Sequence, residues 1–146
     1  MQVDVVADGQ PSGRARFVAR PLQFLGTPHV PHCWDAGLFF DEADRTLLCS
    51  DLFFQPGNPK PLTESDVVQT AKESIIANLA GPMSKDMPYT SYTDATLRRL
   101  AALEPRTLAI MHGSTFRGDG GKAILDQAVQ RRVDRAEAGL VEMAEI

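Results

Sequence analysis

Short runs of apolar residues dominate the N-terminal part of the chain and predict β-strands. Residues 3–6 and 15–18 read as two strands with turn-forming residues between them, and residues 22–25 form a third apolar run. Residues 36–40 and 46–49 follow as a hairpin. Apolar positions in this hairpin are nearly continuous rather than alternating, which predicts two strands that are buried on both faces.

The middle of the chain changes to a helical period. After a proline-rich loop, Thr63 is the expected cap of a helix that ends at Gly81 and Pro82. A second helix is expected to begin at Thr93 and to close before Pro105. The apolar positions that set these periods are Val68, Ala71, Ile75 and Leu79 in the first helix, and Leu97, Leu100 and Ala101 in the second.

A buried strand and a last helix complete the pattern. Residues 107–111 are apolar and run directly into His112, and residues 122–142 carry an apolar stripe at helical spacing. No internal repeat or low-complexity tract interrupts the sequence. A single domain over residues 1–146 is therefore expected, with strands first and then helix, helix, strand and helix.

The bulk composition is that of an ordinary globular protein. It has 43% hydrophobic and 23% charged residues, and no apolar stretch approaches the ~20 residues that span a bilayer. A net charge of −4 argues against nucleic acid or an anionic membrane as a partner. The first residues do not resemble a signal peptide, and two cysteines are too few for a disulfide scaffold, so the reducing cytoplasm is the expected location.

Three residues that can bind metal follow a rigid turn or a predicted buried strand. His32 follows a turn with two prolines, Asp51 follows the strand at 46–49, and His112 follows the strand at 107–111. Side chains at the end of a buried strand are held rigidly at the rim of a sheet, where they can serve as ligands for zinc or iron. Each residue alone has an ordinary explanation, because a histidine beside a strand is usually structural and an aspartate there usually caps a turn.

Together, three stretches resemble the second half of the metallo-β-lactamase superfamily. They are Thr-Pro-His-Val-Pro-His-Cys-Trp-Asp at 27–35, Leu-Leu-Cys-Ser-Asp-Leu-Phe at 47–53 and Ala-Ile-Met-His-Gly-Ser at 109–114. In that superfamily a histidine follows a proline-containing turn, an aspartate ends the next hairpin, and a His-Gly pair ends a late strand. The most similar members are the flavodiiron proteins, which reduce oxygen or nitric oxide, and the hydrolases near them. The resemblance covers nearly the whole chain.

This resemblance implies a role for each of the three residues. His32 would be a terminal ligand of a first metal, Asp51 would bridge two metals, and His112 would be a ligand of the second metal. The implied cofactor is one or two divalent metals, zinc or iron, bound weakly or absent in this chain.

Three further residues would lie near the same site. His29 would stand behind the ligands or form a hydrogen bond within its own loop. Ser114 and Arg117 follow the last ligand and would lie near the mouth of the site, although a solvent-facing loop position is the simpler explanation for both.

The two cysteines are weaker candidates. Cys49 is two residues before Asp51 and would share its face in a strand, but a small core residue is a better interpretation than a thiolate ligand. Cys33 is adjacent to His32 and could approach a metal, but neighbouring side chains in an extended segment point apart, so Cys33 is not assigned as a ligand.

The part of the superfamily pattern that supplies most metal ligands is not found in this sequence. It is a His-x-(His or Glu)-x-Asp-His run, and it also supplies the group that handles the proton. Here only His29 and His32 lie close together. Three ligands divided between two metal positions hold an ion weakly at best. No catalytic residue is assigned, and the chain is expected to be an inactive relative of the metal-dependent hydrolases.

The implied fold is α/β (α+β), the C-terminal half of an αββα metallo-β-lactamase sandwich, with a mixed sheet that carries helices on one face. The other face would be bare and apolar. Leaving ~600 Å² of it in water forgoes on the order of 15 kcal/mol. A homodimer through the bare face, or the missing N-terminal half, would cover it.

Three functions remain open at this point. The chain is a piece of a metal-dependent hydrolase or of a flavodiiron-like oxidoreductase, and works only with the missing half. Alternatively, it is a stand-alone, non-catalytic half-domain that self-associates. The third alternative is a small metal-binding or storage module.

Overall fold

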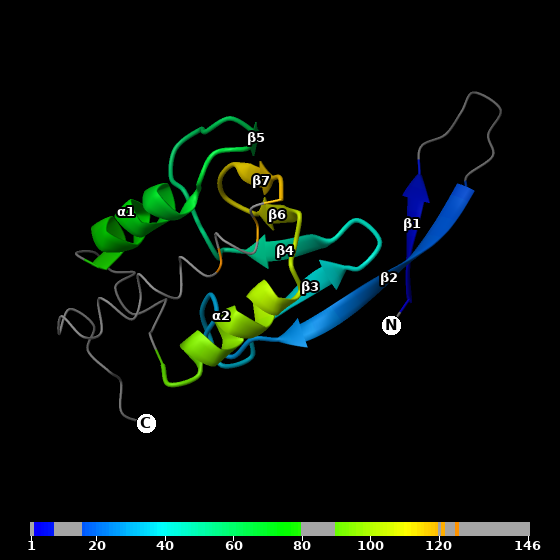
Figure 1. Ribbon diagram of the computed structural model, residues 1–146, viewed down its shortest axis with the longest axis horizontal. Helices are drawn as coiled ribbons and strands as arrows, with labels where there is room; N and C mark the ends of the chain where they lie inside the picture. The colour runs from blue at the N-terminus through cyan, green and yellow to red at the C-terminus, as the bar shows by residue number, and fades with distance from the viewer. Residues whose placement is uncertain (1, 8–15, 80–89, 120, 122–124, 126–146) are drawn as a thin grey trace.

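The computed structural model describes residues 2–7, 16–79, 90–119, 121 and 125. A mixed sheet and two helices make up this part of the chain (Figure 1). The strands are β1 (Gln2–Ala7), β2 (Arg16–Gly26), β3 (Gly37–Asp41), β4 (Thr46–Ser50), β5 (Leu62–Thr63), β6 (Thr107–Ile110) and β7 (Thr115–Arg117), and the helices are α1 (Val68–Leu79) and α2 (Thr93–Ala102).

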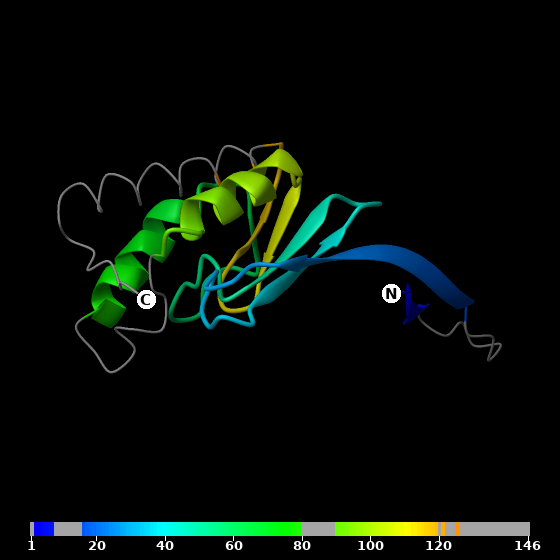
Figure 2. The ribbon, with the colours of Figure 1, turned by 90° about the horizontal axis from the view of Figure 1, so that it is seen from below.

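The seven strands form one sheet in the order β1-β2-β3-β4-β6-β7-β5. Strands β1 to β4 pair antiparallel, β4 pairs parallel with β6, and β7 lies antiparallel to β6 and parallel to β5. Both helices lie on the same face of the sheet (Figure 2). The expected mixed sheet with helices on one face is therefore confirmed.

Neither α1 nor α2 is long and apolar enough to cross a bilayer.

The N-terminal strands follow the predicted pattern with one difference. The runs at 15–18 and 22–25 belong to a single strand, β2. Residues up to Pro21 pair with β1, and the residues from Leu22 onward pair with β3. Pro21 cannot donate a ladder hydrogen bond, and it is tolerated because it stands where β2 exchanges one partner for the other.

The start of α1 differs from the prediction that Thr63 caps it. Thr63 lies in β5, and its Oγ1 accepts a hydrogen bond from the Ser65 N–H at 3.0 Å. The cap is Asp66, whose Oδ1 accepts from the Val68 N–H at 2.7 Å. Both residue types suit a cap, and the pairing of β5 with β7 decides between them.

The predictions for Gly81-Pro82 and for 122–142, apart from the buried Leu125, fall outside the described residues.

Helix α2 begins at Thr93 and ends before Pro105, as predicted. The Thr93 Oγ1 accepts a hydrogen bond from the Thr90 N–H at 2.9 Å, which ties the first turn to the preceding loop. Its buried face carries Thr93, Thr96, Leu97, Leu100 and Ala101, so the helical period of the sequence marks the side that packs on the sheet.

The hydrophobic core lies between the sheet and the helices. In β3, β4 and β6 every second side chain is buried, and these side chains meet the apolar face of α2. The largest of the side chains with almost no exposure are leucines: Leu38, Leu47, Leu97, Leu100, Leu108 and Leu125. The layers are thus joined mainly by leucines.

The opposite face of the sheet carries an open apolar row. Register places Phe24 beside Phe39, Phe39 beside Leu48, and Leu48 beside Ala109. Phe24 is 61% exposed and Leu48 is 42% exposed, and the two phenyl rings meet edge to face at 5.4 Å. The prediction that the hairpin is buried on both faces is therefore wrong for the chain by itself, because no described residue covers this row.

Truncating the core should destabilise the chain far more than truncating an exposed leucine. Leu108→Ala removes a side chain with 0% exposure and should lower the free energy of unfolding by about 2–5 kcal/mol. The matched control Leu62→Ala lies on the surface and should cost less than about 1 kcal/mol. Urea denaturation followed by circular dichroism measures both, and equal losses would contradict the assigned core.

Candidate functional site

Asp51 projects from the end of β4 because the strand stops there with a sharp change of backbone direction. Ser50 has a φ of 49°, a left-handed conformation, and the β4–β6 register shifts between Leu48 and Ser50. A turn follows, in which the Leu52 N–H donates to the Cys49 carbonyl at 2.9 Å. The strain of a left-handed serine is a cost of about 1 kcal/mol or more, and it sets the position of the carboxylate.

His112 lies at the end of the neighbouring strand, and Gln55 holds its loop to the Asp51 loop. The Gln55 N–H donates to the His112 carbonyl at 2.7 Å, and the Gln55 Oε1 accepts from the Ser114 N–H at 3.3 Å. A Cβ on Gly113 would lie 3.0 Å from the Gln55 Cβ, so only glycine fits there without movement. Gln55 is buried, and its role could not be predicted from the sequence, because a single glutamine in a loop does not indicate a structural role.

His32 is presented by a compact loop between β2 and β3. The Thr27 N–H donates to the Ala36 carbonyl at 2.8 Å, and the Thr27 Oγ1 donates to the Val30 carbonyl at 2.6 Å. The His29 N–H donates to the Cys33 carbonyl at 2.7 Å and closes a tight turn around His32. The loop is thus fixed by its own backbone and by the buried Thr27.

The three candidate ligands meet at the carboxylate of Asp51. The His32 Nε2 lies 3.1 Å from one oxygen, Oδ2, and the His112 Nε2 lies 3.5 Å from the other, Oδ1. His32 and Asp51 are partly buried, whereas His112 is exposed and its ring lies edge to face with that of Phe54. Residues from three separate segments therefore share one small region at the edge of the sheet.

These distances can be compared with those of a metal site. Two ligands of one tetrahedral zinc, each about 2.0–2.1 Å from the ion, lie roughly 3.3 Å apart. Both imidazole–carboxylate distances are close to that value. Each pair nevertheless supplies only two ligands to an ion, and three is the usual minimum for a catalytic zinc. Within the described residues, no group of three or more His, Cys, Asp or Glu side chains could hold a metal ion.

Cys33 and Cys49 have different surroundings. The Cys33 Sγ lies 3.3 Å from the His32 Nδ1, in contrast to the expectation that these side chains point apart. The reason is the left-handed backbone at Cys33, whose φ is 63°, because the segment is a turn rather than extended chain. Cys49 is fully buried, and burial raises the pKa of its thiol well above the usual range, so it packs as a neutral core side chain.

The remaining predicted residues are placed as follows. His29 is half-buried and takes part in its loop through its backbone N–H. Ser114 is buried, not solvent-facing, and its N–H binds Gln55. Arg117 does not lie at the mouth of the site. It pairs with Thr107 at the start of β6, the opposite end from His112, because the chain reverses directly after Gly113.

No family model and no curated protein matches this sequence. Solved structures do match it. The chemotaxis sensor ODP from T. denticola in its apo state superposes with a TM-score of 0.54 and 16% identity over 88% of this chain and 48% of that one. A second structure of this sensor, described as its peroxy diiron species, has the same scores. The chain thus spans about half the length of the sensor.

Two further solved structures belong, by their names, to the protein families that the sequence resembles. The flavodiiron protein from Giardia intestinalis has a TM-score of 0.51 and 24% identity over 82% of this chain and 27% of that one. A metallo-β-lactamase family protein from Thermus thermophilus has a TM-score of 0.46 and 18% identity over 82% of this chain and 32% of that one. The chain is therefore similar in fold to part of the chemotaxis sensor and to part of the flavodiiron protein.

Proposed function

We propose that this chain is the half of a metallo-β-lactamase-type, hydrolase-like domain that supplies the bridging ligand of a two-metal site. Asp51 would give one oxygen to each ion, with His32 beside the first ion and His112 beside the second. The observation that carries the proposal is the carboxylate between two imidazoles, with one imidazole at each oxygen. Further ligands would come from a segment that packs on the open face.

The donor set fits divalent zinc or iron in kind but not in number. Imidazole and carboxylate are ligands of both metals, and the structural likeness to a diiron sensor and a flavodiiron protein favours iron. When fully held, such ions polarise substrates and activate water. In this chain each ion would have two protein ligands, too few to hold it for catalysis.

The two free thiols suit a reducing compartment such as the cytoplasm.

Metal binding by the isolated chain should be weak and should depend on Asp51. Asp51→Asn should reduce the affinity for Zn²⁺ or Fe²⁺ at least about tenfold, because even changes behind metal ligands cost 10- to 100-fold. Asp35→Asn, an exposed aspartate in the His32 loop, is the matched control and should leave the affinity unchanged. Anaerobic calorimetric titration measures both. Equal affinities in the two variants would show that the carboxylate is no ligand.

Hydrolysis by the isolated chain should be negligible with any added divalent metal. Each ion has two protein ligands where a working zinc site has three, so a bound water would not be held for attack. The measurement is turnover of lactam, thioester and phosphodiester substrates after loading with Zn²⁺, Fe²⁺ or Mn²⁺. Turnover well above background that is lost in His112→Ala would overturn this expectation, since it would show that the present ligands suffice.

The second candidate function is that of a non-catalytic half-domain that self-associates, and the open apolar row favours it. A two-fold dimer through this row would bury the face of each copy, with more than ~2,000 Å² expected for an obligate interface. Exposed phenyl and leucyl side chains at the centre of a sheet suit such an interface.

Self-association should be abolished by a charge in the middle of the open row. Leu48→Lys should convert a dimer to a monomer in sedimentation experiments, because burying an unpaired ammonium at an apolar interface is costly. Tyr92→Lys, at an exposed aromatic residue beside α2, should leave the dimer intact. Apparent stability of the unchanged chain should rise with protein concentration. A well-folded monomer at micromolar concentration would eliminate this candidate.

A further inference from the structure

A second polar region lies at the opposite end of the sheet, where β4 and β6 begin. It is a hollow of about 590 Å³, and three of its lining residues are Arg45, Arg106 and Arg117. We call it the arginine hollow. We propose that the arginine hollow binds the phosphate group of a small molecule, at a site separate from Asp51 and the two histidines.

Strand register places three polar side chains in one row across the floor of the hollow. Thr46 pairs with Thr107, and Thr107 pairs with Arg117. The neighbouring residue within each strand, Leu47, Leu108 or Phe116, is buried in the core, so these three side chains lie on the open face of the sheet. Two hydroxyl groups and a guanidinium, held by adjacent strands, form a set of donors that suits phosphate oxygens.

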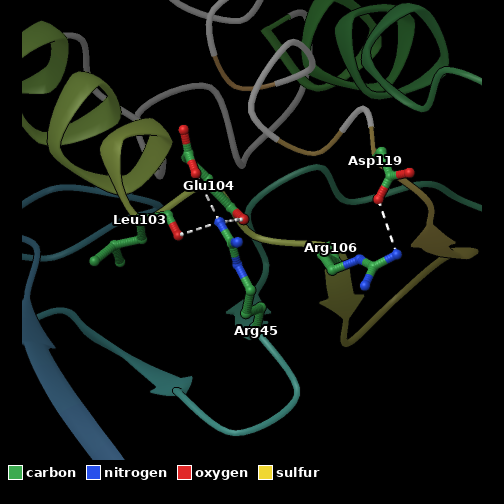
Figure 3. Close-up of polar contacts among 5 residues, drawn as sticks. All are labelled: Arg45, Leu103, Glu104, Arg106 and Asp119. Atoms are coloured by element: carbon green, nitrogen blue, oxygen red, sulfur yellow. Dashed lines mark hydrogen bonds and ion pairs between the residues drawn. The ribbon is translucent and has the colours of Figure 1, made fainter.

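Two further guanidinium groups line the hollow, and Figure 3 shows Arg45 with Leu103 and Glu104 and Arg106 with Asp119. The Arg45 Nη2 donates to the Glu104 carbonyl at 2.6 Å and to its Oε2 at 2.9 Å, and the Arg106 Nη2 lies 3.0 Å from the Asp119 Oδ1. These contacts all use a single nitrogen of each arginine. Within the described part of the chain, no contact uses the other N–H groups of the two guanidinium groups, and these groups can donate to an anion in the hollow.

The carboxylates of Glu104 and Asp119 belong to an adjoining hollow of about 430 Å³, not to the arginine hollow itself. Their side chains are 62% and 85% exposed, and ion pairs at such positions hold little energy. The arginine hollow contains one carboxylate of its own, that of Asp44. Because Arg45 and Arg106 already pair with the exposed carboxylates of Glu104 and Asp119, a phosphate group in the hollow would compete with both ion pairs. Its hydrogen bonds would come from the guanidinium groups and from the two threonine hydroxyl groups that line the hollow.

A purely structural ion-pair network would explain Arg45 and Arg106 but not Arg117. Arg117 is exposed and forms no ion pair within the described part of the chain, although it lines the same hollow. The volume is also within the range of about 300–1,000 Å³ that small-molecule sites occupy. Space therefore remains for the body of a ligand beside its phosphate group.

The test is calorimetric titration of the full chain at constant ionic strength with two ligands, inorganic phosphate and adenosine monophosphate. Saturable binding of either is expected. Arg117→Gln should weaken binding at least about tenfold, because it removes a charge-assisted hydrogen bond. Arg98→Gln, which removes an exposed arginine on α2, should change the affinity less than twofold. Tighter binding of the ester would identify a phosphorylated small molecule as the ligand, and equal binding would identify the free anion.

The absence of saturable binding of both ligands at 10 mM would overturn the proposal, as would equal losses in Arg117→Gln and Arg98→Gln. Since Arg117 is exposed, its replacement does not threaten the fold, and circular dichroism verifies this. Titration of phosphate into Asp51→Asn separates the two sites. Unchanged phosphate affinity in that variant is expected, and a loss equal to that of Arg117→Gln would show that phosphate binds at the candidate metal site.

Discussion

The parallel pairing of β4 with β6 determines where all the polar chemistry of this chain lies. Parallel strands begin at one edge of a sheet and end at the other, so the residues that follow them are brought together in space. Asp51 and His112 meet at the edge where the two strands end, and Arg45 and Arg106 meet where the strands begin. An antiparallel pairing would have placed Asp51 beside Arg106 and His112 beside Arg45, and would have separated the two candidate ligands.

The core supports this arrangement from one side only. Leucines of β3, β4 and β6 are buried against the helices, while alternate positions on the same strands present phenyl, leucyl and threonyl side chains outward. A sheet with one apolar face in water loses a large part of the stabilisation that its sequence can provide. The open row crosses β4 and β6 at Leu48 and Ala109, between the arginine hollow where these strands begin and the candidate metal site where they end.

The sequence predicted those features that depend on local periodicity or on strand ends. Helix α2 and the hairpin of β3 and β4 follow from where apolar runs begin and stop. The closeness of His32, Asp51 and His112 was expected from strand ends, a proline turn and the family resemblance together. The pairing of β5 with β7, which removed Thr63 from the helix start, connects segments too distant for any periodicity to indicate.

The errors within the site have a different origin. The contact between Cys33 and His32 arises from a left-handed turn at a residue that is not glycine, which sequence patterns do not anticipate. Arg117 is close to His112 in sequence but not in space, because the reversal at Gly113 carries it to the far edge of the sheet. Gln55 carries no chemical signature, and its importance comes only from burial and hydrogen bonds.

The hydrogen bonds of Gln55 limit how the loops that carry Asp51 and His112 can move relative to each other. Its backbone and side chain each bind the loop after β6, while the Met111 N–H binds the Ser50 carbonyl at 3.0 Å from the other direction. The loop that carries Asp51 and the loop that carries His112 are therefore coupled at three points and must open together. Thermal fluctuation can swing this pair as one body relative to the His32 loop, because among the described residues the His32–Asp51 side-chain contact joins that loop to them and no backbone hydrogen bond does. The separation between Asp51 and His112 would stay nearly constant, and His32 would be the member of the site whose distance varies.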